Sequence, residues 1–178
     1  MRPEADVLAG NALGQLAFSR PPYGSSMPFL AESPARVLLV DDEPRILSSL
    51  GELLKGRGFV LTSAANGIEA IQHLNQEPFD LVILDLRLPD MSGHDIMDFM
   101  NTRQTGANMI VTSGDREIEA AIGALKRGAY DYLRKPYSPE ELLKTIDNAL
   151  KQRRLQAENQ HIAGQLESSR PDFLRSGR

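Results

Sequence analysis

Polar residues that could do chemistry stand at the ends of four short runs along the sequence. They are two adjacent carboxylates, a third carboxylate, a pair of hydroxyls and an ammonium: Asp41 and Asp42, Asp85, Thr112 and Ser113, and Lys135. Three carboxylates at one point would repel one another unless a cation such as Mg2+ lay between them. A cation and an ammonium would then attract a phosphoryl group, with a carboxylate as its acceptor.

Each of these residues also has an ordinary structural interpretation when it is taken alone. One aspartate of the Asp41-Asp42 pair could cap a helix that begins at Pro44. Asp85 could be a loop or cap residue, and Lys135 a solvated charge at the end of a strand. The chemical interpretation therefore depends on whether the fold brings all of them together.

The elements that would position these residues alternate five times between residues 36 and 150. Strand-like runs are expected at Val37–Val40, Phe59–Thr62, Leu81–Leu84, Met109–Val111 and Tyr130–Leu133, with segments of helical period between them. The first, third and fourth runs are wholly apolar, which is typical of strands buried on both faces. The pattern predicts an α/β fold with a doubly wound five-stranded parallel sheet. Such sheets bind ligands beyond the carboxyl ends of their strands, where the polar residues would meet.

The last helix is expected to run far beyond the sheet. It begins at Ser138–Glu141, where Ser is a suitable N-cap, Pro takes the first turn and Glu follows. Its helical pattern continues to about Ser168, a length of about 45 Å. Three apolar residues recur after Leu150, namely Leu155, Ile162 and Leu166. They specify a coiled coil only weakly, so a solvated helix that frays is the alternative.

Charge divides the chain in the same way as the pattern of elements. We expect a flexible N-terminal extension at 1–34, a domain at 35–150, and a continuation of the last helix with a loose tail at 151–178. The domain carries 18 acidic and 12 basic residues, a net charge of −6, while the last segment carries +3. An acidic domain argues against a nucleic-acid-binding surface, and the basic residues of the tail are spread thinly.

Composition argues against several kinds of site and segment. The 178 residues include no cysteine, so disulfides, thiolate metal sites and cysteine nucleophiles are excluded. No apolar run approaches the roughly 20 residues that cross a membrane. The first residues do not resemble a signal peptide, because acidic residues follow Arg2 at once. We therefore expect a cytoplasmic protein.

Four stretches of the sequence resemble the receiver domain of two-component response regulators. In order and spacing they are Leu39–Pro44, Leu84–Gly93, Val111–Gly114 and Gly128–Pro136. The resemblance covers residues 35–150 and implies a flavodoxin-like (βα)5 domain with an extended C-terminal helix. It also implies a phosphoprotein that switches a protein-interaction face. Such a protein is a signalling phosphoacceptor and no enzyme, apart from self-directed phosphoryl transfer and autodephosphorylation.

The resemblance assigns the acidic residues to phosphoryl transfer. Asp85 would accept the phosphoryl group from a histidine kinase. Asp41 and Asp42 would hold Mg2+ beside it, together with Asp85 and the backbone carbonyl of Arg87. Arg87 and Asp115 stand where the family varies, which leaves the lifetime of the phosphate open.

The resemblance also assigns the residues of the switch. Lys135 would pair with the phosphate, and Tyr132 would be the aromatic switch residue. Ser113 fits the switch hydroxyl better than Thr112, because a small residue, Gly114, follows it and its spacing to Lys135 matches the family. Thr112 would then point to the other side of the strand.

Other chemistries fit the sequence less well. A phosphatase with an aspartate nucleophile usually has a second aspartate two residues later, where Arg87 stands. A nucleotide-binding P-loop needs a glycine-rich run before Lys-Ser or Lys-Thr, and the sequence has none. His161 is not in a setting that resembles a phosphotransfer histidine, so we interpret it as a surface residue.

The sequence does not decide which partners the domain has or how it passes on its signal. Upstream, the resemblance implies a sensor histidine kinase or a phosphotransfer protein. Downstream, the chain could bind a partner protein or form a homodimer. It could also be a receiver fragment of a longer regulator with an effector domain, because Leu150–Asn159 resembles the signalling helices that follow receivers. A phosphorylation-independent interaction module is a further alternative.

Overall fold

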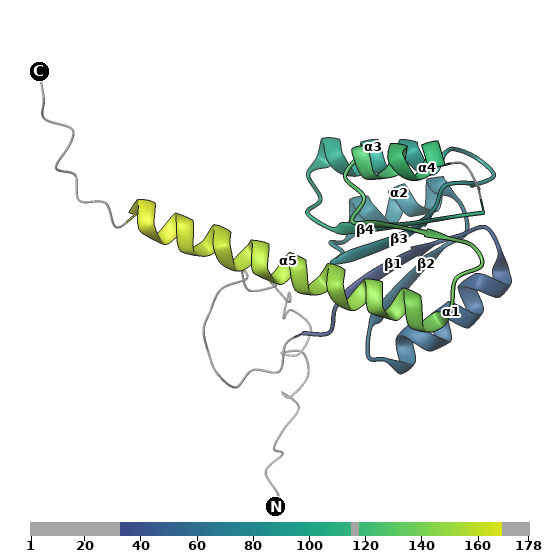
Figure 1. The fold of residues 1–178 in the computed structure, drawn as a ribbon, viewed down its shortest axis with the longest axis horizontal. Helices are drawn as coiled ribbons and strands as arrows, with labels where there is room; N and C mark the ends of the chain where they lie inside the picture. The colour runs from purple at the N-terminus through teal and green to yellow at the C-terminus, as the bar shows by residue number, and fades with distance from the viewer. Residues whose placement is uncertain (1–32, 115–117, 169–178) are drawn as a thin grey trace, which may run out of the picture.

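Five parallel strands form one sheet in the computed structural model, which describes residues 33–114 and 118–168 (Figure 1). Their order across the sheet is β2-β1-β3-β4-β5. The strands are β1 Arg36–Val40, β2 Val60–Ala64, β3 Leu81–Asp85, β4 Asn108–Ser113 and β5 Asp131–Arg134. The predicted doubly wound parallel sheet is confirmed.

Five helices cover the two faces of the sheet. They are α1 Pro44–Gly56, α2 Gly67–Gln76, α3 Gly93–Arg103, α4 Ile118–Lys126 and α5 Pro139–Ser168. Helices α2, α3 and α4 pack on one face, and α1 and α5 pack on the other (Figure 1). Successive strand residues point to opposite faces, so Val82 belongs to the first core cluster and Ile83 to the second.

The three inner strands contain the three runs of the sequence that are wholly apolar. Every residue of β3 is buried, and β1 and β4 are buried after their first residues. The edge strand β2 is partly exposed, and its predicted bounds were shifted. Phe59 lies before β2, and the strand continues to Ala64 because Ala64 pairs with Val40 of β1. Hydrogen bonds to a neighbouring strand therefore decide where the edge strand ends.

Helix α5 begins as its sequence predicts. The Ser138 hydroxyl accepts the backbone N–H of Glu141 at 3.1 Å, which caps the helix. Leu142, Ile146 and Ala149 are fully buried against the sheet. The helix then continues to Ser168 and projects from the domain as a long arm (Figure 1). We call its residues 151–168 the α5 extension.

The α5 extension exposes its apolar side chains. Leu155, Ile162 and Leu166 are 55%, 52% and 67% exposed. The expected N-terminal extension lies outside the described residues except for positions 33 and 34, and the expected tail lies outside them from residue 169. Among the helices that the structure describes, none is long and apolar enough to cross a membrane.

Candidate functional site

Three aspartates meet at the carboxyl end of the sheet. Asp41 follows β1 and Asp85 ends β3, and these strands are paired neighbours with Val40 opposite Leu84. Asp41 and Asp85 are buried, whereas Asp42 is exposed. One carboxylate oxygen of each lies within 4.8 Å of the others. Such a set of hard oxygen donors, open on one side, fits a divalent cation such as Mg2+.

Lys135 bridges the two buried aspartates. Its Nζ donates to Oδ2 of Asp85 at 2.6 Å and to Oδ2 of Asp41 at 2.7 Å. Burial on its own would lower the pKa of Lys135. The hydrogen bonds to Asp41 and Asp85 outweigh burial, however, and raise the pKa above its ordinary value. The ammonium therefore stays charged and offsets the repulsion between the carboxylates.

The remaining oxygens of the two buried aspartates are also engaged. Oδ1 of Asp41 accepts the backbone N–H of Glu43 at 2.9 Å. Oδ1 of Asp85 accepts the backbone N–H of Arg87 at 2.9 Å. Each buried carboxylate is thus held at both oxygens, and the backbone at Arg87 is drawn to the site.

Strand β4 brings the two hydroxyl candidates to the same edge. Thr112 and Ser113 are both buried, and Thr112 lies opposite Asp85 in the register of β3 and β4. The backbone N–H of Lys135 donates to the carbonyl oxygen of Ser113 at 2.8 Å. The peptide bond between Lys135 and Pro136 is cis, as the sequence allowed. Strands β3, β4 and β5 therefore end level with one another.

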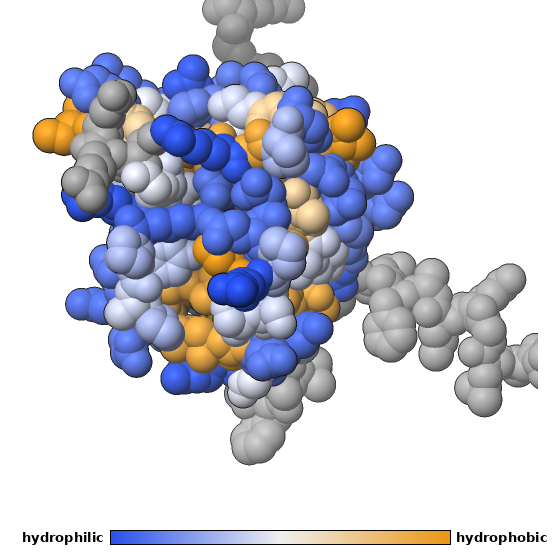
Figure 2. Space-filling view, turned by 90° about the vertical axis from the view of Figure 1, so that its right-hand side faces the viewer, coloured by the Kyte–Doolittle hydropathy of each residue, from blue (hydrophilic) through white to orange (hydrophobic). Residues whose placement is uncertain are grey.

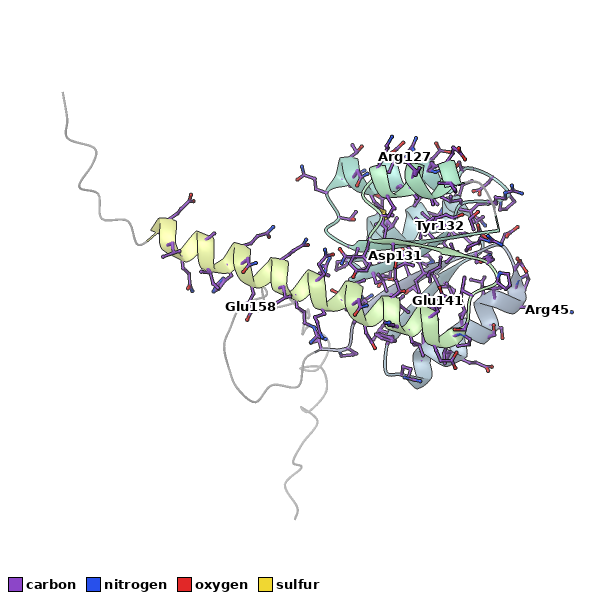
Figure 3. The ribbon with its side chains drawn as sticks, in the orientation of Figure 1. Arg45, Arg127, Asp131, Tyr132, Glu141 and Glu158 are labelled. Atoms are coloured by element: carbon purple, nitrogen blue, oxygen red, sulfur yellow. The ribbon has the colours of Figure 1, made fainter. Side chains whose placement is uncertain are left out.

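The two hydroxyl residues differ in the face on which they lie. Thr112 is two residues after Ile110 in β4, so it lies on the side of the cluster under α1 and α5, to which Ile110 belongs and against which Tyr137 packs. Val111 and Tyr132 face each other in register and pack on the side of α2, α3 and α4. Because alternate strand residues share a face, Ser113 shares this side with Tyr132. Tyr132 is half-buried and is labelled in Figure 3.

Gly93 packs against the backbone that carries Asp85, a contact that the sequence analysis did not identify. A Cβ atom on Gly93 would lie 2.6 Å from the carbonyl oxygen of Asp85 and 2.8 Å from Cα of Leu86. The N–H of Gly93 also donates to the carbonyl oxygen of Leu86 at 2.9 Å. The glycine stands in one of the stretches that resemble receivers, which was the available signal.

Asp90 ties the loop after β3 to the start of α2. Its two carboxylate oxygens accept the N–H groups of Gly67 and Ile68, both at 2.8 Å. The bond from Gly67 is the main reason that the pKa of Asp90 lies below its ordinary value. No pattern in the sequence indicated this contact. Helix α2 also has an N-cap of its own, Asn66, whose side chain accepts the N–H of Glu69.

Figure 2 shows the end of the molecule toward which the strands point. Hydrophilic side chains form a band across this end, with apolar patches on both sides. Asp115, expected to influence phosphate lifetime, lies outside the described residues.

The model of a protein family, the response regulator receiver domain, matches residues 37–147 of the chain. The transcriptional regulatory protein GlrR of Escherichia coli K12 is 36% identical over 123 residues, which are 69% of this chain and 28% of GlrR. The chain thus spans little more than a quarter of that relative.

Solved structures are similar over the same region. A receiver domain protein (CheY-like) from Methanospirillum hungatei JF-1 matches with a TM-score of 0.67 and 31% identity, over 70% of this chain and 99% of that one. The beryllofluoride-activated NtrC4 receiver domain dimer matches with a TM-score of 0.63 and 36% identity, over 66% of this chain and 98% of that one.

Proposed function

The chain belongs to the family of response regulator receiver domains, and we propose that Asp85 is its phosphoacceptor. Phosphorylation on aspartate is the property of this family. The observation that carries the assignment is the environment of Asp85. Its carboxylate is buried at the end of β3, 2.6 Å from the Lys135 ammonium and within 4.8 Å of two further carboxylates.

The transfer would use the residues in the following way. A carboxylate oxygen of Asp85 forms a bond to phosphorus while the bond between phosphorus and the donor imidazole nitrogen breaks. No general base is needed, because an aspartate is normally ionised near neutral pH. The ammonium of Lys135, already between Asp41 and Asp85, pairs with the added phosphoryl oxygens.

Receiver domains bind Mg2+ in an acidic pocket, and three carboxylates of this chain fit that ion. Asp41, Asp42, Asp85 and the backbone carbonyl of Arg87 would hold it. When bound, Mg2+ offsets the negative charge of the carboxylates and the incoming phosphoryl group. Asp42 is the exposed member of the set, so it leaves the site open to solvent and to a phosphodonor.

Phosphorylation would be communicated through Ser113 and Tyr132. The two residues share the face of the sheet that α4 covers, and β4 and β5 connect them directly to the site. Helix α4 exposes three apolar residues, Ile118, Ile122 and Leu125, at helical spacing. We therefore assign the protein-interaction face to α4, β5 and the adjoining part of α5.

A sensor histidine kinase or a phosphotransfer protein is the upstream partner in this proposal, and the protein is a cytoplasmic phosphoacceptor without a further catalytic activity. The receiver would comprise residues 35–150, preceded by an extension and followed by the α5 extension. The chain spans 28% of the matched regulator GlrR. That fraction favours a second assignment for the output, in which the receiver is part of a longer regulator and α5 leads to an effector domain.

Intact mass after incubation with acetyl phosphate and Mg2+ tests the phosphoacceptor directly. We expect one added phosphoryl group on the native chain and none on Asp85→Asn. The matched control is Asp147→Asn, which changes an exposed aspartate of α5 and should be modified like the native chain. Absence of the added mass from folded native protein would contradict the proposal and favour a phosphorylation-independent interaction module.

A further inference from the structure

The amino end of the sheet, opposite the candidate site, holds a buried carboxylate that the proposed function does not use. Asp80 is 3% exposed and directly precedes β3. Its Oδ2 accepts the backbone N–H of Arg36, the first residue of β1, at 2.8 Å. Its Oδ1 lies 3.4 Å from Nε of Arg153, on α5. A buried carboxylate needs compensation, and Arg153 supplies the opposite charge.

Arg153 lies beyond the last buried residue of α5. That residue is Leu150, and Lys151, Gln152 and Arg154 are all exposed. The side chain of Arg153 is nevertheless only 20% exposed, because it lies against the domain. A guanidinium can reach a carboxylate in this way while its alkyl stem packs along the surface.

A second contact ties α5 to the same end of the sheet one turn earlier. Nδ2 of Asn108, the first residue of β4, donates to the carbonyl oxygen of Ala149 at 2.6 Å. The backbone N–H of Asn108 donates to the carbonyl oxygen of Asp80 at 3.1 Å. Asp80 and Asn108 thus form one connected unit that holds α5 at two successive turns.

The side of the α5 extension that faces the domain is therefore defined. Ala157, one turn after Arg153, is half-buried. Leu155 lies nearly opposite Arg153 around the helix and is 55% exposed. The large apolar side chains of the extension, Leu155, Ile162 and Leu166, consequently lie on the side of the helix that points away from the domain.

We propose that Asp80 and Arg153 form a clamp that fixes the direction in which α5 leaves the domain. Residues 154–168 continue from this point as a projecting helix, on which Glu158 is labelled in Figure 3. Any segment joined to the end of α5 then keeps a set orientation relative to the receiver. The clamp is independent of the phosphoryl chemistry at Asp85, so the two proposals stand or fall separately.

Spin labels on introduced cysteines can measure the direction of the α5 extension, because the chain has no cysteine of its own. We would place cysteines at Arg45 on α1 and Gln165 on α5, both exposed, and record the distribution of distances between the labels by pulsed electron resonance. The native clamp should give a narrow distribution, and Arg153→Met should broaden it at least twofold. Lys151→Met, which removes an exposed charge half a turn away, is the matched control and should leave it unchanged.

Hydrogen exchange gives a second readout on the unlabelled chain. Amides of residues 151–160 should exchange about tenfold faster in Arg153→Met, because local opening of the helix becomes easier. Arg153→Lys should give an intermediate result, since it keeps the charge but not the guanidinium. If the distances and the exchange of Arg153→Met both equal those of the native chain, there is no clamp. If Arg153→Met unfolds the domain, Arg153→Lys and Asn108→Ala take its place, and a native-like arm in both would overturn the proposal.

Discussion

At the scale of single residues, Lys135 stabilises a site that would otherwise repel itself. Its ammonium lies between Asp41 and Asp85, whose side chains are 2% and 7% exposed, and it offsets their charge. Two buried carboxylates left without a counter-charge would favour opening of the domain. The lysine needed for phosphate pairing therefore also stabilises the unphosphorylated protein.

Lys135→Met should lower the free energy of unfolding by about 3 kcal/mol in the absence of Mg2+, because it removes one partner of a largely buried ion-pair set. Millimolar Mg2+ should restore most of the loss, since a bound cation supplies the missing charge. Urea denaturation with and without Mg2+ measures both effects. Lys144→Met, an exposed lysine of α5, is the control and should change stability by less than about 0.5 kcal/mol. Equal stability of Lys135→Met and the native chain without Mg2+ would refute this account.

Asp90 should make stability depend on pH. The Gly67 N–H favours the charged carboxylate and lowers the pKa of Asp90 below its ordinary value of 3.8. A group whose pKa is lower in the folded state contributes its stability above the unfolded value and loses it as pH falls through the folded value. Native protein should therefore be more stable than Asp90→Asn at neutral pH, and the difference should shrink below about pH 4.

Urea denaturation of both proteins over this pH range tests the Asp90 prediction. Asp147→Asn, another exposed aspartate without a capping role in the described structure, should show no such pH-dependent difference from the native chain. A difference between native protein and Asp90→Asn that stays the same from neutral to acid pH would mean that the charge of Asp90 is not what stabilises the start of α2.

At the scale of elements, the start of α3 sets the position of the end of β3. Gly93→Ala would place a methyl group 2.6 Å from the Asp85 carbonyl, so backbone must move. We expect a loss of about 2 kcal/mol in the free energy of unfolding and slower phosphorylation, because Asp85 shifts. Gly56→Ala, where a Cβ meets nothing within 4 Å, should lower neither the stability nor the rate. Chemical denaturation and the rate of mass gain from acetyl phosphate measure the two effects; a native-like Gly93→Ala would contradict the close contact.

The sequence predicted elements best where one local rule decided the outcome. Strand β3 is apolar because it is buried on both faces, and α5 begins where Ser138 can cap it. The bounds of β2 were shifted because its end depends on pairing with β1, which local sequence does not specify. The meeting of Asp41, Asp85 and Lys135 was predicted because parallel strands end at one edge.

Contacts that depend on how helices pack could not be predicted in this way. Asp90 reaches α2 and Asp80 reaches Arg153, and both depend on how helices pack against the sheet. Each aspartate looks like an ordinary turn residue in the sequence. The division of roles between Thr112 and Ser113 stays a prediction, although the structure sets the two on different faces of β4.

At the scale of the whole molecule, α4 presents an apolar surface that phosphorylation is expected to use. Ile118, Ile122 and Leu125 are 72%, 44% and 50% exposed. We expect beryllofluoride with Mg2+ to shift the sedimentation mass from monomer toward dimer, and Leu125→Gln to reduce the shift. Leu155→Gln, an equally exposed leucine on the α5 extension, is the control. An unchanged mass, or a loss of the shift in Leu155→Gln alone, would contradict an α4 interface.

Because the α5 extension is long, a small tilt at its base displaces its far end by a large distance. Residues 154–168 span about 22 Å beyond Arg153. A tilt of roughly 10° at the base of a helix of this length would displace its far end by about 4 Å. Angular changes too small to alter any packing contact inside the domain would thus become displacements as large as a side chain at the tip.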